Sequence, residues 1–257
     1  MAAGLTAADP AALGDPDSEG LAAGFQAAED SQEDGKMEQM INEFKEALKE
    51  NLLSVIRFGT EGQPNNFLFV VKKLDFGILQ KIKPLVIAHK KRTEIVPLFF
   101  TQEELMEGAD VFPLEFLDIK YPHTVLYGED VVEKIKFDKK HVRRQIEFEL
   151  RSKLIHLREH FIWVKKPREL EPLLSSAVPN LMPLFYGLLF LKDTKPPTEL
   201  DALFKAVEDA YRIDVSILKK ARALSKQKAR DEELGSMVKE LMEFLASLGS
   251  QLDRMKF

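Results

Sequence analysis

Short apolar runs in the first half of the chain predict strands. Residues 52–58 (LLSVIRF) and 67–73 (FLFVVKK) are rich in β-branched and aromatic residues, and a polar cluster of Gly, Pro and Asn separates them. Runs of this kind, bounded by turn residues, favour strands over helices. Residues 95–100 (IVPLFF) and 124–127 (TVLY) predict two more strands, the first at a sheet edge or a bulge because Pro97 cannot donate to a central ladder. Two strands in immediate succession cannot be parallel neighbours, so the sheet is predicted to be mixed.

Helical periodicity accompanies these strands. Apolar side chains recur three and four residues apart over residues 37–50. The same spacing recurs in the segment that follows Asp75, which is placed to cap a helix. Thr101 and Glu104 have the spacing of a capping box, which predicts a short helix after the third strand. The predicted order over residues 37–128 is therefore α-β-β-α-β-α-β.

Beyond residue 139 the pattern predicts helices only. One long helix carries an apolar stripe, formed by Val142, Ile146, Leu150, Leu154, Leu157 and Phe161. Further helical segments are expected over 170–191, with interruptions at Pro179 and Pro183, and over 199–211, 215–228 and 232–256. We therefore expect an α+β protein, with a mixed sheet and flanking helices over 37–135 and an all-α helical bundle over 136–257.

Composition separates the N-terminal segment from the rest. Residues 1–36 hold eight acidic residues and one Lys, a net charge of −7, so the remaining chain has −5 + 7 = +2. Few large apolar residues occur there, which predicts a disordered acidic tail. The chain has no Cys, which excludes disulfides and thiolate metal sites. Its longest apolar stretch, 181–191, is shorter than the roughly 20 residues that cross a bilayer. We expect a cytoplasmic protein without a membrane partner.

The element order and two motif positions resemble the nucleotidyltransferase superfamily of DNA polymerase beta and kanamycin nucleotidyltransferase. In that superfamily the first strand ends in Gly-Ser and the second opens with Asp-x-Asp. Here Phe58-Gly59-Thr60 and Asn65-Asn66-Phe67 stand at these places. Residues 110–130 (DVFPLEFLDIKYPHTVLYGED) also look like bacterial proteins classed as nucleotidyltransferase-like. The resemblance covers most of residues 37–190 and implies a nucleotidyltransferase-like α/β domain.

The departure from the superfamily pattern predicts lost catalysis. The alignment puts Asn65 and Phe67 where the two metal-binding aspartates stand, and Mg²⁺ prefers anionic oxygens. Two-metal phosphoryl transfer without these ligands is not expected. The sequence therefore predicts a catalytically degenerate module that binds nucleotide or phosphate, or regulates a partner, without a cofactor. The alternative is an active Mg²⁺-dependent nucleotidyltransferase with relocated metal carboxylates at Glu94, Glu115 and Asp118.

Glycines in the turn between the first two strands are the candidates for phosphate binding. Gly59, Thr60 and Gly62 would offer backbone N–H groups to a phosphate, as Gly-rich turns do. The same residues also suit an ordinary hairpin turn. His123 is placed to lie at this end of the sheet, where a single His is more often structural.

Basic residues gather after the sheet. Residues 134–168 hold twelve Lys and Arg against four acidic residues, and Arg144, Arg151 and Arg158 recur at heptad spacing. This pattern predicts binding to a polyanion, either nucleic acid or an acidic protein. Interleaved glutamates would offset part of the field. Arg151 and His156 also have the spacing found in RNases of the HEPN helical-bundle superfamily, which makes an RNA-binding or RNase module a further alternative.

Overall fold

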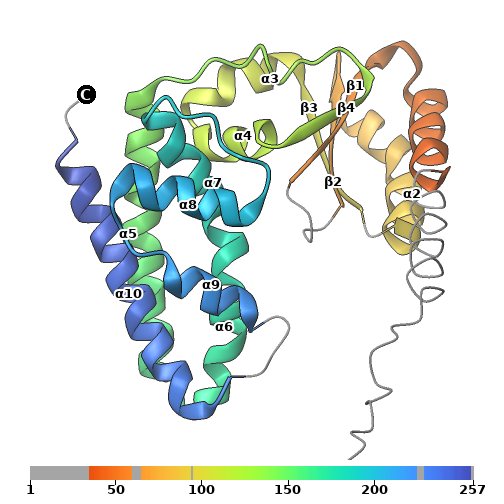
Figure 1. Cartoon of the computed structure of the whole chain (residues 1–257). Coiled ribbons are helices and arrows are strands. Elements are labelled where there is room, and N and C mark those ends of the chain that lie inside the picture. The colour runs from red at the N-terminus through yellow and green to blue at the C-terminus, as the bar shows by residue number, and fades with distance from the viewer. Residues whose placement is uncertain (1–34, 60–64, 94, 225–228, 256–257) are drawn as a thin grey trace, which may run out of the picture.

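A four-stranded sheet forms the first half of the protein. The computed structural model describes residues 35–59, 65–93, 95–224 and 229–255. The strands are β1 (Leu52–Phe58), β2 (Asn65–Val71), β3 (Ile95–Thr101) and β4 (His123–Gly128), in the order β3-β2-β1-β4 (Figure 1). β1 is antiparallel to β2 and β4, whereas β2 and β3 are parallel. The predicted mixed sheet is confirmed, and Pro97 lies on the edge strand β3.

Helices cover both faces of this sheet. A first helix over 35–48 and α2 (Phe76–Thr93) pack on one face, and α3 (Gln102–Glu107) and α4 (Pro113–Lys120) on the other. Successive side chains of a strand point to opposite faces. Phe67 and Phe69 accordingly join the cluster under the first helix, while Leu68 and Val70 join the cluster under α4.

Two helix starts follow the chemistry predicted from sequence. The Asp75 carboxylate accepts a hydrogen bond from the Ile78 N–H at 3.0 Å, which satisfies one of the free donors in the first turn of α2. Thr101 and Glu104 form the capping box of α3. A 3₁₀ turn (Lys49–Asn51) leads into β1, and another (Gly108–Asp110) links α3 to α4.

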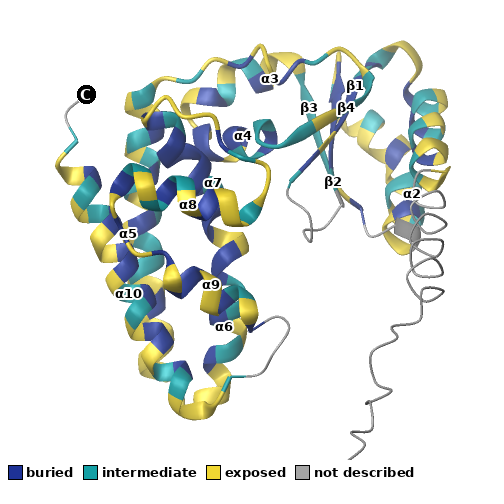
Figure 2. Ribbon diagram, in the orientation of Figure 1, coloured by how far each residue is buried: buried dark blue, intermediate teal, exposed yellow. Residues whose placement is uncertain are grey.

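A helical bundle follows β4. Its elements are α5 (Lys139–Trp163), a 3₁₀ turn (Pro167–Leu170), α6 (Glu171–Ser175), α7 (Ala177–Leu191), α8 (Leu200–Tyr211), α9 (Ser216–Ala223) and α10 (Asp231–Asp253). α5 and α10 lie side by side, and α7 is the most deeply buried helix (Figures 1 and 2). The segment Pro167–Leu191 is long and apolar enough to cross a membrane, but most of it is buried inside the protein, as in the core of a soluble protein.

The expected interruptions at Pro179 and Pro183 are wrong. The helical path breaks at Ser176 instead, and α7 continues through both prolines. Pro179 lies in the first turn of α7, where its missing N–H has no intrahelical acceptor to lose. Pro183 does remove an internal hydrogen bond, and burial of nearly every other α7 side chain offsets that loss.

α4 connects the sheet to the bundle. Phe116 and Ile119 belong to the cluster on the sheet, whereas Leu114 and Leu117 belong to the bundle core. Gly187 of α7 allows close approach, because a Cβ there would clash with Leu114 and crowd Ile146. This contact fixes α4 against α5 and α7.

Candidate functional site

The Gly59 end of the sheet is where the sequence places a nucleotide site. Phe58 pairs with Asn66 on β2 and with His123 on β4. Gly59 has a φ of 102° and donates its N–H to the Pro122 carbonyl at 3.1 Å. That donor is therefore already used within the fold. Thr60, Gly62 and Glu94 lie outside the described residues.

Apolar side chains occupy both faces of β2 at this end. Phe67 is buried with its ring centroid 6.4 Å from that of Phe69, and Leu68 is fully buried on the opposite face. Of the two positions aligned with the metal-binding aspartates, Phe67 is therefore occupied by a buried aromatic ring. Within the described part of the chain, no group of three His, Cys, Asp or Glu residues is placed to hold a metal ion.

Glu115 and Asp118 instead belong to the contact between α4 and the bundle. The Gln145 amide nitrogen donates to the Glu115 carboxylate at 2.7 Å, and the Gln145 amide oxygen accepts from the Leu114 N–H at 2.8 Å. Gln145 of α5 thus satisfies a free N–H in the first turn of α4 while holding Glu115. The acidic pair predicted from its spacing does share a helix, but Glu115 is bonded to α5 and not to the sheet.

Asp118 lies beside a buried tyrosine of α7. Burial raises the pKa of the Asp118 carboxyl to about 6, and the charge of Glu115 adds to the rise. Burial, together with the Asp118 charge, also raises the pKa of Tyr186. The Tyr186 side chain is 1% exposed, and its hydroxyl has no hydrogen-bond partner among the described residues. We call Glu115, Asp118, Gln145 and Tyr186 the α4–α7 junction.

The tyrosine of this junction was missed in the sequence. Tyr186 lies inside the apolar run 181–191, which predicted only a buried helix. A tyrosine within such a run buries a hydroxyl that needs a hydrogen-bond partner. This polar group in an apolar run was the sequence feature that could have identified Tyr186 as a candidate.

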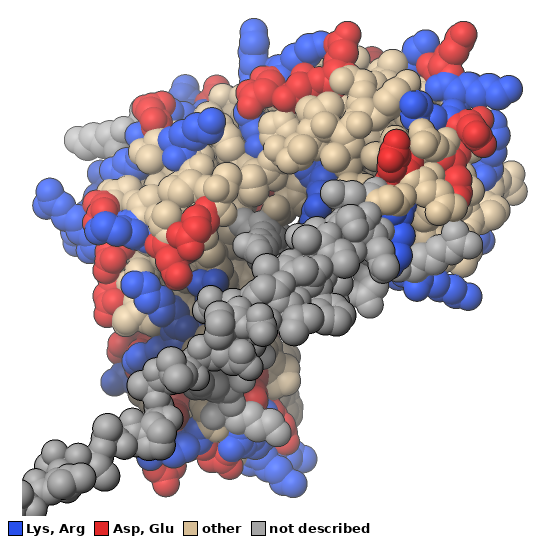
Figure 3. All heavy atoms as spheres, turned by 45° about the vertical axis from the view of Figure 1, so that its right-hand side comes forward, with Lys and Arg blue, Asp and Glu red and all other residues tan. Residues whose placement is uncertain are grey.

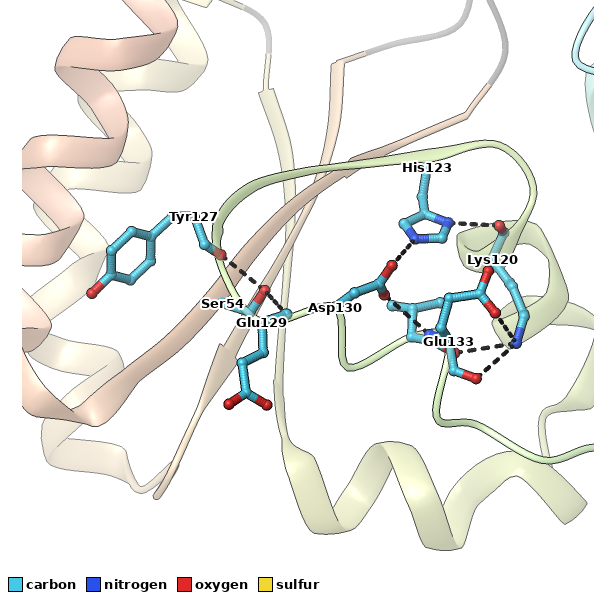
Figure 4. Close-up of polar contacts among 8 residues, drawn as sticks. Ser54, Lys120, His123, Tyr127, Glu129, Asp130 and Glu133 are labelled. Carbon is cyan, nitrogen blue, oxygen red and sulfur yellow. Dashed lines mark hydrogen bonds and ion pairs between the residues drawn. The ribbon is translucent and has the colours of Figure 1, made fainter.

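A second polar cluster lies where β4 begins and ends (Figure 4). The two ring nitrogens of His123 lie 2.8 Å from the Lys120 carbonyl and 3.0 Å from the Asp130 carboxylate. The second Asp130 oxygen accepts from the Glu133 N–H at 3.1 Å. Lys120 reaches the Glu133 carboxylate at 3.2 Å and the Glu133 carbonyl at 3.2 Å. We call these four residues, with Ser54, the β4 turn.

Every charged group of the β4 turn has a partner. Burial acts to raise the pKa of Asp130, but hydrogen bonds from His123 and from the Glu133 and Val132 N–H groups outweigh it and hold that pKa below its usual range. Ser54, which is fully buried, donates its hydroxyl toward the carbonyls of Tyr127 and Glu129. This geometry favours the structural interpretation of His123.

The three predicted arginines lie on the solvent side of α5. Arg144, Arg151 and Arg158 are all exposed. Arg151 pairs with Glu147 at 2.9 Å and approaches Asp253 at 3.6 Å. His156, the other residue of the RNase-like spacing, is exposed and pairs with Glu159 at 3.1 Å. Arg151 and His156 therefore have separate acidic partners and do not converge on one site.

Positive charge does not gather on the face of the protein that Figure 3 shows. On the face seen in Figure 3, basic and acidic side chains are interspersed over the part of the protein that the structure describes.

Known protein families give no match to this chain, and curated proteins give none either.

Proposed function

We propose that this protein is a catalytically degenerate nucleotidyltransferase-like module that acts by binding, either to a nucleotide or as a regulatory partner of another molecule. The observation that carries the proposal is the burial of Phe67, at one of the two positions aligned with the metal-binding aspartates. A Mg²⁺ site needs anionic oxygens at the sheet end, and apolar groups supply none.

The alternative of an active enzyme with relocated carboxylates has less support. Glu115 is held by Gln145 of α5, and among the described residues no three His, Cys, Asp or Glu side chains are placed to hold a metal ion. Mg²⁺ sites in proteins use one or two carboxylates together with substrate phosphates, and Glu115 is already bonded to α5.

Incubation with labelled nucleoside triphosphates, Mg²⁺ and Mn²⁺ tests the proposal. We expect no transfer of nucleoside monophosphate. The matched variants are Glu115→Gln and Glu103→Gln, since Glu103 is an exposed carboxylate of α3 with no role in either hypothesis. Turnover that Glu115→Gln abolishes and Glu103→Gln preserves would establish the relocated site and overturn the degenerate module.

The binding part of the proposal has its own measurement. A nucleotide held by backbone donors and neutral side chains should raise the thermal midpoint equally with Mg²⁺ and with EDTA. A rise that requires Mg²⁺ would contradict the proposal, because it would reveal metal ligands at the site.

A further inference from the structure

The solvent side of α5 carries a stripe in which arginines and large apolar residues alternate. With about 100° per residue, six side chains fall within an arc of about 80°, opposite the buried face of the helix. We call them the α5 outer stripe: Arg144, Phe148, Arg151, Ile155, Arg158 and Ile162. Phe148 is 66% exposed, Ile155 53% and Ile162 77%, so a row of apolar surface faces water. Such a row on a protein surface marks an interaction site.

The arginines of this stripe are incompletely neutralised. Arg151 has Glu147 and Asp253 nearby, whereas no ion pair within 4 Å involves Arg144 or Arg158 among the described residues. The stripe therefore offers positive charge and apolar surface along one line.

The alternation of arginines and apolar residues along the α5 outer stripe limits which kind of partner can bind there. A helix that lies on a membrane separates an apolar face from a charged one, so that only the apolar face enters the lipid. On the α5 outer stripe, burying the isoleucines would bury the arginines as well. A nucleic acid would match the arginines but leave Ile155 and Ile162 without apolar contact. A polypeptide that carries both acidic and apolar residues can satisfy both kinds of side chain.

The chain itself contains such a polypeptide. Residues 1–34 hold eight acidic residues and no Lys or Arg. Its large apolar residues, Leu5, Leu13, Leu21 and Phe25, are interleaved with these acidic residues. We propose that residues 1–34 bind the α5 outer stripe of the same chain, with their carboxylates on the arginines and their Leu and Phe side chains on the apolar row.

Chain length permits this contact. A stretch of 34 residues spans up to about 110 Å when extended, and a 257-residue protein has a radius of gyration of about 18 Å. Attachment to the same chain also gives the segment a high effective concentration, so weak individual contacts suffice for occupancy.

Trp163 reports on the stripe. It is the one tryptophan of the chain, it is 81% exposed, and it follows Ile162 at the end of α5. We expect acrylamide to quench Trp163 more strongly in the protein lacking residues 1–34 than in the full chain. A synthetic peptide of residues 1–34, added to the truncated protein, should restore the protection saturably and less tightly at high salt.

Matched variants locate the contact. In the truncated protein, replacing Arg144, Arg151 and Arg158 by Ala should weaken peptide binding about tenfold or more, since each exposed ion pair contributes modestly. Replacing Lys81, Lys83 and Lys90, exposed residues of α2, removes the same charge and should leave binding unchanged. Ile155→Ser with Ile162→Ser tests the apolar row while preserving the arginines.

Four outcomes overturn the proposal. Equal quenching in the full and truncated proteins, with no response to the peptide, would show that residues 1–34 do not reach α5. Equal weakening by both triple variants would show unspecific attraction. Protection that grows with protein concentration and accompanies dimers in sedimentation would assign the segment to a second copy. Binding of single-stranded RNA by the truncated protein, without binding of the peptide, would assign the stripe to nucleic acid.

Discussion

The β4 turn and the α4–α7 junction each hold a partly exposed carboxyl and a buried hydroxyl, but the surroundings of these groups differ. In the β4 turn, hydrogen bonds hold the pKa of Asp130 down, and the Ser54 hydroxyl has two carbonyls to donate to. In the junction, burial raises the pKa of Asp118 to about 6, and the Tyr186 hydroxyl has no partner among the described residues. A satisfied cluster stabilises a fold, whereas an unsatisfied one leaves capacity for a proton or a ligand atom.

The largest effect is expected at Asp118. Its folded pKa of about 6 exceeds the ordinary value of 3.8. The folded state therefore retains a proton that the unfolded state releases, and stability falls as pH rises from about 4 to about 6. A pKa difference of about two units between the folded and unfolded states corresponds to roughly 3 kcal/mol in the free energy of unfolding. Asp118→Asn should raise the free energy of unfolding by up to about 3 kcal/mol at pH 8 and change it little at pH 4, measured by urea denaturation at both pH values.

Asp130→Asn is the control with the opposite sign. Its pKa is lowered in the folded protein, so its carboxylate stabilises the fold above the ordinary pKa and loses that contribution as pH falls. This variant should be less stable than the parent at pH 8. If both variants changed stability in the same direction at pH 8, the contrast between the clusters would be wrong.

His123 carries the next effect. Its ring bridges the Lys120 carbonyl and the Asp130 carboxylate, and hydrogen bonds to charged groups contribute about 1.5–3 kcal/mol. His123→Phe should lower the free energy of unfolding by about 2 kcal/mol and raise the pKa of Asp130, which NMR titration measures. His156→Phe, at an exposed pair on α5, should change stability by less than about 0.5 kcal/mol. Equal effects of the two variants would count against a structural role for His123.

The sheet was predictable because its signals are local. The run 52–58 lies on β1, the short strand near 124–127 lies on β4, and the Thr101 capping box forms as spaced in the sequence. Pro97 indicated either an edge strand or a bulge, because proline has no N–H to donate to a ladder, and β3 lies at the sheet edge. The prolines near 180 misled because tertiary burial, which local reasoning does not contain, decides whether a helix continues past them.

The polar clusters were only half predictable. Spacing put Glu115 and Asp118 on one helix, but it did not show that Gln145, thirty residues further along, would hold Glu115. His123 was recognised, whereas its partner Asp130 depends on how the chain turns after β4. Such pairings arise from packing between elements, and one sequence without packing cannot supply them.

A pair of hydroxyl deletions sharpens the comparison further. Ser54→Ala removes the hydroxyl that donates toward the carbonyls of Tyr127 and Glu129, although the Glu129 carbonyl still accepts from the Val131 N–H, and should cost about 1 kcal/mol. Tyr186→Phe removes a hydroxyl that has no partner among the described residues, and should stabilise the protein by about 1 kcal/mol. Thermal midpoints measured in one buffer check both signs. A loss of stability in Tyr186→Phe would mean that the hydroxyl is satisfied by a bound water or ligand.

The smallest effect is expected at the exposed edge of the β4 turn. Lys120 lies 3.2 Å from the Glu133 carboxylate, but it also lies 3.2 Å from the Glu133 carbonyl, and that carbonyl remains when the side chain is changed. The Glu133 side chain is mostly exposed, so solvent screens its charge. Glu133→Gln should therefore change the free energy of unfolding by no more than about 0.5 kcal/mol in urea denaturation at pH 7. A loss above about 1 kcal/mol would show that Lys120 depends on the carboxylate, and that the β4 turn is held by charge more than by its backbone hydrogen bonds.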